Sequence, residues 1–271
     1  MKRRQFVGTA FWFALGSGLV VACGDRSGSP GAGKSPEALR FSVTDLQGLE
    51  PLEKDFGAFY EALGEAIGLP VEPVPLDSFV AAAPALLNQQ MDLVLAGPSE
   101  YLLLNARAKA VPIVALTRPN YRTRITVRAD SGIETMQDLK GKVFGVASEG
   151  ATAGHIGAGQ LMSDAGLTPS EDVTIRIIGK TRVQALLAEE IDAFAASPNT
   201  TAKILSKVDG AAEQVKTLID GPPLPNDVFV ASSSLDKAFL KNLGEAMVDQ
   251  QDALLEALLQ SPGNSKYAKS K

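Results

Sequence analysis

The 271-residue chain is 45% hydrophobic and carries 26 basic and 31 acidic residues, for a formal net charge of −5. This acidic balance excludes the basic footprint of a nucleic-acid-binding protein. A single cysteine and a single histidine exclude an internal disulfide and a Cys/His metal cluster, so we expect no metal and no cofactor.

The first 23 residues have the pattern of an export signal. A basic start precedes the apolar stretch Ala10–Leu15, which is short for a membrane-spanning helix. The run Arg3–Val7 (RRQFV) resembles a bacterial twin-arginine signal, and Val20–Cys23 (VVAC) resembles a lipobox. We therefore predict a signal peptide over residues 1–23, lipidation of Cys23, and a place at the periplasmic face of the cell membrane. An uncleaved anchor helix is the alternative.

Residues 24–36 predict a flexible tether, because this stretch is rich in Gly, Ser and Pro and has little to bury. Removal of the signal with Lys2, Arg3 and Arg4 takes the net charge from −5 to −8. The folded part should begin near Glu37.

From there on, short apolar runs alternate with segments of helical periodicity, which predicts an α/β architecture with parallel sheets. The predicted strands are 39–43, 71–75, 92–96, 125–128, 143–146, 173–178, 191–195, 214–218 and 228–231. The predicted helices are 56–67, 79–88, 99–108, 136–139, 154–165, 183–189, 200–207 and 237–259.

Two α/β lobes account for this order of elements. We predict that residues 37–124 and 229–271 form lobe 1 and that residues 125–228 form lobe 2. A cleft between lobes is where such folds bind ligands. A single continuous sheet is the alternative.

The segment Gly145–Ile156 (GVASEGATAGHI) joins a predicted strand to a predicted helix. The first turn of a helix presents unpaired backbone N–H groups at the positive end of the helix dipole, and these attract oxyanions. Thr152 adds a hydroxyl, Gly154 permits close approach, and His155 could donate to an anion. The alternative is that Thr152 caps the helix and His155 is a surface residue.

A second strand-to-helix junction lies at Leu95–Tyr101 (LAGPSEY). Pro98 and Ser99 fit a helix start, and Tyr101 would project from its first turn. Phe79, Tyr121 and Tyr60 are candidates for the wall of the cleft, with core packing as the alternative.

Five segments together resemble the phosphate, phosphite and phosphonate-binding proteins of bacterial ABC importers. Gly97-Pro98 followed by Tyr101, and Thr152 followed by Gly154-His155, are the narrower motifs. The resemblance implies the two-lobed type II periplasmic binding protein fold and a small anionic ligand held by a monomer that serves an ABC permease and ATPase. The five segments are Leu76–Phe79, Met91–Tyr101, Tyr121–Thr123, Asp130–Lys142 and Ala151–His155.

The chain departs from the family pattern at the turn that grips the anion. The family has Ser-Thr-Ser-Gly there, whereas this chain has Ala151, Thr152, Ala153 and Gly154, so two hydroxyl donors are lost. Lys180 and Thr181 stand where phosphonate binders tend to have a histidine, and Phe79 stands where the family often has tyrosine. The ligand residues implied by the resemblance are Phe79, Ser99, Tyr101, Tyr121, Ala151, Thr152, Ala153, Gly154, His155, Lys180 and Thr181.

The predicted function is that of a lipid-anchored binding component of an importer, not an enzyme. Hinge closure around a ligand needs contacts on both lobes and no catalytic group. Two alternatives stay open at this stage. One is a sensor that binds a ligand without transport, and the other is an enzyme that uses the carboxylates of Asp45, Glu100 or Glu149.

Overall fold

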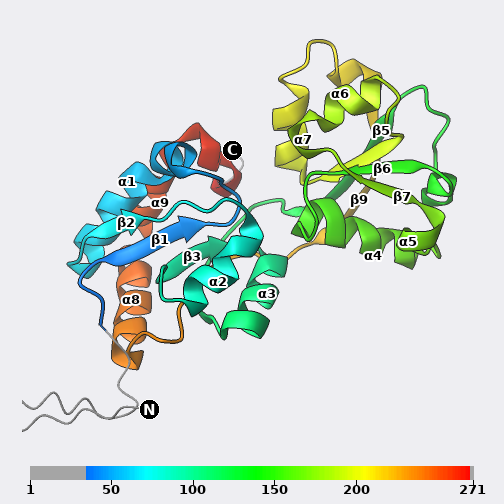
Figure 1. Cartoon of the computed structure of the whole chain (residues 1–271). Coiled ribbons are helices and arrows are strands. Elements are labelled where there is room, and N and C mark those ends of the chain that lie inside the picture. The colour runs from blue at the N-terminus through cyan, green and yellow to red at the C-terminus, as the bar shows by residue number, and fades with distance from the viewer. Residues whose placement is uncertain (1–34, 269–271) are drawn as a thin grey trace, which may run out of the picture. The chain divides into compact units, whose positions relative to one another are not determined.

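A computed structural model describes residues 35–268, which form two lobes that each contain a five-stranded sheet (Figure 1). The strand order is β2-β1-β3-β10-β4 in lobe 1 and β7-β6-β8-β5-β9 in lobe 2. The alternative of one continuous sheet is therefore wrong for this part of the chain. The predicted signal peptide, the lipidation site Cys23 and the tether up to residue 34 lie outside the described residues.

The sheet of lobe 1 is mixed, with one strand that runs against the other four. β1 (Leu39–Val43) pairs in parallel with β2 (Val71–Pro73) and β3 (Leu93–Ala96). β10 (Asp227–Ala231) runs antiparallel between β3 and β4 (Val111–Leu116). The helices of this lobe are α1 (Leu49–Ile67), α2 (Ala82–Leu87), α3 (Pro98–Ala108), α8 (Lys237–Asp249) and α9 (Gln251–Leu259), with 3-10 turns η1 (Phe79–Ala81) and η6 (Pro262–Tyr267).

Lobe 2 repeats this plan. β6 (Val143–Val146) pairs in parallel with β7 (Thr174–Ile177) and β8 (Ala193–Ala196). β5 (Arg122–Arg128) runs antiparallel between β8 and β9 (Val215–Pro223). The helices are α4 (Gly157–Asp164), α5 (Pro169–Asp172), α6 (Arg182–Leu187) and α7 (Pro198–Leu205), with 3-10 turns η2 (Met136–Leu139), η4 (Gly179–Thr181) and η5 (Ala212–Gln214) and the π-helix η3 (Thr152–Ile156).

The prediction of parallel sheets is right for three strands of each sheet and wrong for the strands that pair antiparallel, which make both sheets mixed. The strand Val111–Leu116 (VPIVAL) was not predicted; this apolar run contains Pro112, a residue that argues against a strand. The helix predicted over 154–165 begins instead as a π-helix at Thr152, since His155 N–H and Ile156 N–H both donate to Ala151 O.

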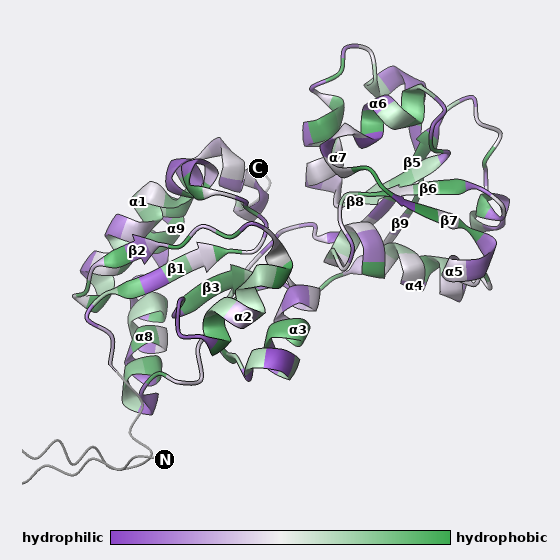
Figure 2. Cartoon of the chain, viewed as in Figure 1, coloured by the Kyte–Doolittle hydropathy of each residue, from purple (hydrophilic) through white to green (hydrophobic). Residues whose placement is uncertain are grey.

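Each lobe buries its own apolar core. In lobe 1 the aromatic rings of Phe41, Phe56, Phe59, Tyr60 and Phe229 pack together between the sheet and α1. In lobe 2 apolar side chains of β5, β6 and β8 pack against α4. Figure 2 shows hydrophobic residues along β3 and β6 and a mixture of hydrophilic and hydrophobic residues on the helices. Further apolar clusters pack around α2 and α3 in lobe 1 and around α6 in lobe 2.

Gly157, the first residue of α4, is expected to reject any larger residue. A Cβ there would collide with Thr123 Oγ1 of β5 and lie 3.1 Å from Thr152 O, and Thr123 is buried. We expect Gly157→Ala to lower the free energy of unfolding by about 1–3 kcal/mol in urea titrations, because a packed junction must shift. Gly159→Ala in the same helix is the control, since its nearest neighbour would be Pro169 Cγ at 3.9 Å. Equal free energies of unfolding for the two variants would show that the predicted collision at residue 157 costs no stability.

Candidate functional site

Polar side chains gather at one edge of each sheet. Parallel strands place their carboxyl ends at the same edge, and β1 is followed there by Asp45 and β3 by the start of α3. The antiparallel strand β10 begins at that edge with Asp227, which pairs with Leu116 at the end of β4. In lobe 2, η3 follows β6 and Ser197 follows β8 at the corresponding edge.

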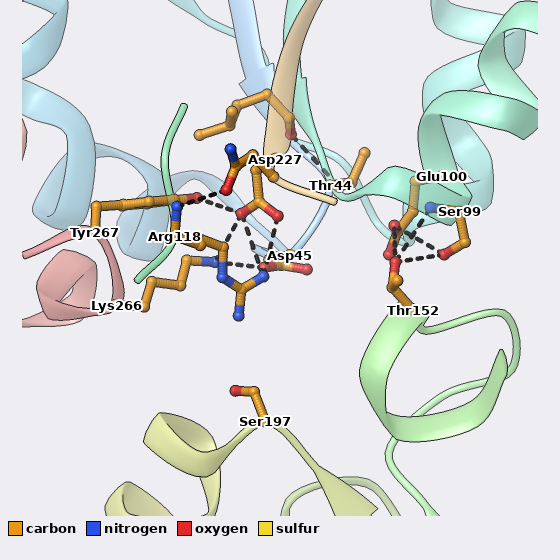
Figure 3. A network of polar contacts seen from close by, with 12 residues as sticks. Thr44, Asp45, Ser99, Glu100, Arg118, Thr152, Ser197, Asp227, Lys266 and Tyr267 are labelled. Atoms are coloured by element: carbon orange, nitrogen blue, oxygen red, sulfur yellow. Dashed lines mark hydrogen bonds and ion pairs between the residues drawn. The ribbon is translucent and has the colours of Figure 1, made fainter. Parts of the chain in front are cut away.

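Ser99 of lobe 1 and Thr152 of lobe 2 are in direct hydrogen-bond contact (Figure 3). The Ser99 N–H donates to Thr152 Oγ1 over 3.1 Å, and the two hydroxyl oxygens are 2.7 Å apart. The Ser99 hydroxyl also lies 2.7 Å from the carbonyl oxygen of Gly150, which it reaches as a donor. The two junctions singled out in the sequence thus meet in space.

Glu100 joins this contact from the first turn of α3. Its Oε2 lies 3.2 Å from Ser99 Oγ and 3.3 Å from Thr152 Oγ1, and only 8% of the residue is exposed. Burial, and then the negative charge of Asp45, raise the pKa of the Glu100 carboxyl, whereas its own backbone N–H and Ser99 act in the opposite direction. The carboxyl therefore holds its proton to a higher pH than an ordinary glutamate.

A charged network lies beside it in lobe 1 (Figure 3). Arg118 Nη1 donates to Asp227 Oδ1 over 3.0 Å, and the Tyr267 hydroxyl donates to Asp227 Oδ2 over 2.8 Å. Lys266 Nζ is 2.6 Å from Asp45 Oδ2 and 3.9 Å from Asp227 Oδ2. The network connects the loop after β4 to the C-terminal turn η6.

The environment fixes the charge states of this network. Lys266 holds the pKa of Asp45 below its usual range. Burial opposes the charge of Arg118, but Asp227 and other negative groups raise its pKa, so the guanidinium stays charged. The guanidinium carbon lies 3.6 Å from the ring centroid of Tyr121, a cation–π contact, and burial raises the pKa of Tyr121 to about 12. The network thus holds two cations and two carboxylates close together in lobe 1.

The residues of the predicted anion turn have different surroundings. Thr152 does not cap the helix, since the N-cap position is Ala151 and no side-chain capping bond is present there. A Cβ on Gly154 would lie 3.2 Å from Ala195 O, so this glycine lets the turn approach β8. His155 Nδ1 accepts from Gly150 N–H over 2.9 Å, and its ring lines an apolar pocket of about 240 Å³ within lobe 2. Ala153 is buried.

Four other predicted ligand residues lie outside the Ser99–Thr152 contact. Tyr101 is half-buried and packs against the apolar cluster of α2 and α3. Lys180 and Thr181 are exposed in η4, where the Thr181 hydroxyl donates to Ile178 O over 3.2 Å. Phe79 begins η1, and its side chain is not described. Their roles toward a ligand stay predictions.

Several polar residues of the site were not singled out in the sequence. Three segments far apart along the chain supply these residues, which are Arg118, Asp227 and the adjacent pair Lys266 and Tyr267. The antiparallel placement of β10 brings Asp227 to Arg118. The one available signal was an aspartate at the start of a strictly apolar strand, Val228–Ala231. Ser197, the N-cap residue of α7, is the lobe-2 residue that Figure 3 shows opposite Arg118.

Within residues 35–268, no group of His, Cys, Asp or Glu side chains is arranged to hold a metal ion. No helix in the same range combines the length and apolar character needed to cross a membrane.

Two lobes of mixed α/β sheets with polar strand ends in contact define a class: binding proteins of the type II periplasmic fold. PhnD1 from Prochlorococcus marinus in complex with methylphosphonate has a TM-score of 0.68 at 15% identity, covering 84% of this chain and 91% of that chain. XAC2383 from Xanthomonas citri bound to ATP has a TM-score of 0.71 at 14% identity, covering 86% and 94%. These likenesses confirm the predicted fold.

The family is shown by a family model, described as ABC transporter, phosphonate, periplasmic substrate-binding protein, that matches residues 42–270. The chain belongs to this family and is a periplasmic substrate-binding component of an ABC transporter, not an enzyme. The tetrathionate sensor histidine kinase TtrS of Salmonella typhimurium is 32% identical over 118 residues, which are 40% of this chain. The chain matches about a fifth of that kinase's length, 19%.

Proposed function

We propose that the chain binds a small oxyanion of phosphorus, such as phosphate, phosphite or a phosphonate, between its two lobes and delivers it to a membrane permease. The observation that carries the proposal is the meeting of Ser99 and Thr152, one hydroxyl from each lobe, at the first turns of α3 and η3. A ligand that accepts hydrogen bonds from both hydroxyls is bound by both lobes, as hinge closure requires. The structural likeness to a methylphosphonate complex supports this ligand class.

A thermal-shift screen of the purified full chain in mild detergent tests the ligand class. The panel contains phosphate, phosphite, methylphosphonate, 2-aminoethylphosphonate, methanesulfonate, tetrathionate and ATP. A ligand at about 100 times its Kd adds roughly 2.7 kcal/mol to the free energy of unfolding. Stabilisation by a phosphorus oxyanion is the expected result, and a folded protein that responds to none of them would overturn the proposal.

Thr152→Val is expected to weaken binding of the stabilising oxyanion by tenfold or more, because the ligand loses a hydroxyl donor at a charged acceptor. Isothermal titration calorimetry gives the Kd, and the melting temperature without ligand reports the fold. Thr174→Val is the matched control, since Thr174 is an exposed residue of β7. Unchanged affinity in Thr152→Val would remove Thr152 from the ligand site.

We also propose that Cys23 carries the lipid anchor that holds the protein at the membrane. Cys23→Ser should move the protein from the membrane fraction to the periplasmic fraction of the producing cell, because the thiol is the site of lipid attachment. Intact mass of the wild-type protein should show the added acyl chains. Persistent membrane association of Cys23→Ser would favour an uncleaved anchor helix.

A sensory role is the second candidate, favoured by the similarity to part of the TtrS kinase. It predicts that tetrathionate stabilises the chain more than any phosphorus oxyanion in the same screen. Deletion of the chain's gene would then abolish a transcriptional response to the ligand without reducing its uptake, whereas an importer component would lose uptake.

A further inference from the structure

The oxygen atoms around Glu100 make more close contacts than there are protons to form hydrogen bonds. Four oxygen–oxygen contacts join Ser99 Oγ, Thr152 Oγ1, Gly150 O and Glu100 Oε2, at 2.7, 2.7, 3.2 and 3.3 Å. Each hydrogen bond needs one proton, and the two hydroxyls supply two. With Glu100 ionised, two of the four contacts have no proton between their oxygens. A proton on Glu100 lets a third contact become a hydrogen bond.

The Glu100 carboxyl lies against Gly97, where no other residue would leave space for it. Gly97 leaves the room that the carboxyl occupies, because a Cβ at residue 97 would collide with Glu100 Oε2 and lie 3.4 Å from Thr152 Oγ1. Only 8% of Glu100 is exposed, so water does not replace the missing donors freely. A buried carboxyl therefore lies against both hydroxyls proposed to hold the ligand.

The groups that face Glu100 do not neutralise it. Burial, then Asp45 and then Asp227 raise the pKa of its carboxyl. The cations nearby are each engaged by a carboxylate, Arg118 by Asp227 and Lys266 by Asp45. Arg118, Lys266 and Tyr267 contact the carboxylates of Asp227 and Asp45, and Tyr121 lies against Arg118. Tyr101 and Arg107 belong to α3 itself, and Glu149 and His155 belong to the segment that carries Gly150 and Thr152.

We propose that Glu100 makes the site selective for oxyanions that can carry a proton, because the ligand and the Glu100 carboxyl must share one. An oxygen that accepts from Ser99 and Thr152 comes within reach of Glu100 Oε2, since both hydroxyls lie within 3.3 Å of that atom. Two deprotonated oxygens would repel there. This inference rests on the proposed function and names the selectivity of the same site.

The chemistry separates two classes of ligand of similar shape. Phosphate, phosphite and phosphonates have an ionisation near neutral pH, as phosphate monoesters do at about 6, so the monoanion brings its own proton. Sulfonates, sulfate and polythionates have no proton to share at that pH. Glu100 thus favours the first class above the pH at which its own carboxyl ionises.

The test compares methylphosphonate with methanesulfonate by isothermal titration calorimetry of the full chain from pH 5.5 to 8.5. For the wild-type protein we expect at least tenfold tighter binding of methylphosphonate at pH 8. On the alkaline side its Kd should rise about tenfold per pH unit, as uptake of one proton requires. Glu100→Gln offers an N–H donor in place of the shared proton, so the pH slope should flatten and the preference should fall toward one. Glu61→Gln, at an exposed glutamate of α1, is the control.

A measurement on the unaltered protein guards against misfolding of the variant. The binding enthalpy of methylphosphonate in two buffers of different ionisation enthalpy reports the protons taken up, and close to one is expected at pH 8.5. Equal affinity for both ligands at pH 8, no proton uptake, or an unchanged slope in folded Glu100→Gln would each overturn the role of Glu100 alone. Failure of the wild-type protein to bind any phosphorus oxyanion would overturn the proposed function as well.

Discussion

Replacing Asp227 by alanine should lower the free energy of unfolding by about 3–5 kcal/mol, because a buried cation loses its partner. Arg118 has a side chain only 9% exposed, and its Nη1 lies 3.0 Å from Asp227 Oδ1. The Tyr267 hydroxyl loses its acceptor in the same substitution. For a protein of this size the loss corresponds to a fall in Tm of roughly 6–20 °C. Urea unfolding followed by circular dichroism measures it.

Asp220→Ala is the matched control for Asp227→Ala. Asp220 pairs with Arg124 at 2.6 Å, a shorter contact, but the two side chains are 33% and 29% exposed. Solvent screens such a pair, so we expect a loss of about 1 kcal/mol or less. If both variants lose the same stability, contact geometry rather than burial sets the cost, and the network around Asp227 is not a structural anchor of lobe 1.

The sequence could place Ser99 and Thr152 at the ligand site because each residue follows a buried strand. A small-residue turn after a parallel strand lies at the carboxyl edge of its sheet, and both junctions satisfy that rule. Sequence periodicity predicted these strands to within one or two residues. The two hydroxyls that meet were therefore among the predicted ligand residues.

The sequence could not predict the proposed role of Glu100 at the ligand site, although it offered Glu100 as a carboxylate that an enzyme could use. A glutamate in the first turn of a helix is commonly a solvated residue that complements the helix dipole. Its carboxyl contacts Thr152, which belongs to a segment about fifty residues away. Arg118 and Asp227 are joined through an antiparallel strand that returns after the whole of lobe 2, and no local pattern encodes that pairing.

Phe41→Ala should cost about 3–5 kcal/mol, a loss comparable to that of Asp227→Ala but confined to the core of lobe 1. Phe41 is fully buried in β1, and its ring lies 5.5–6.1 Å, centroid to centroid, from four other aromatic rings. Removing it leaves a cavity at the centre of that cluster. Leu87→Ala, at a residue 57% exposed on α2, is the control, and we expect it to change stability by no more than about 0.5 kcal/mol.

The same substitution tests how the two lobes are coupled. The aromatic cluster around Phe41 in lobe 1 and the apolar cluster of β5, β6, β8 and α4 in lobe 2 share no residue. We therefore expect Phe41→Ala to split thermal unfolding into two calorimetric transitions. A ligand that binds only when both lobes are folded stabilises each through the other, and saturating ligand should therefore bring the two transitions together. One transition without ligand would show that contacts such as Ser99 to Thr152 already couple the lobes. Two transitions that ligand does not merge would place the ligand on one lobe alone and contradict a site built from both hydroxyls.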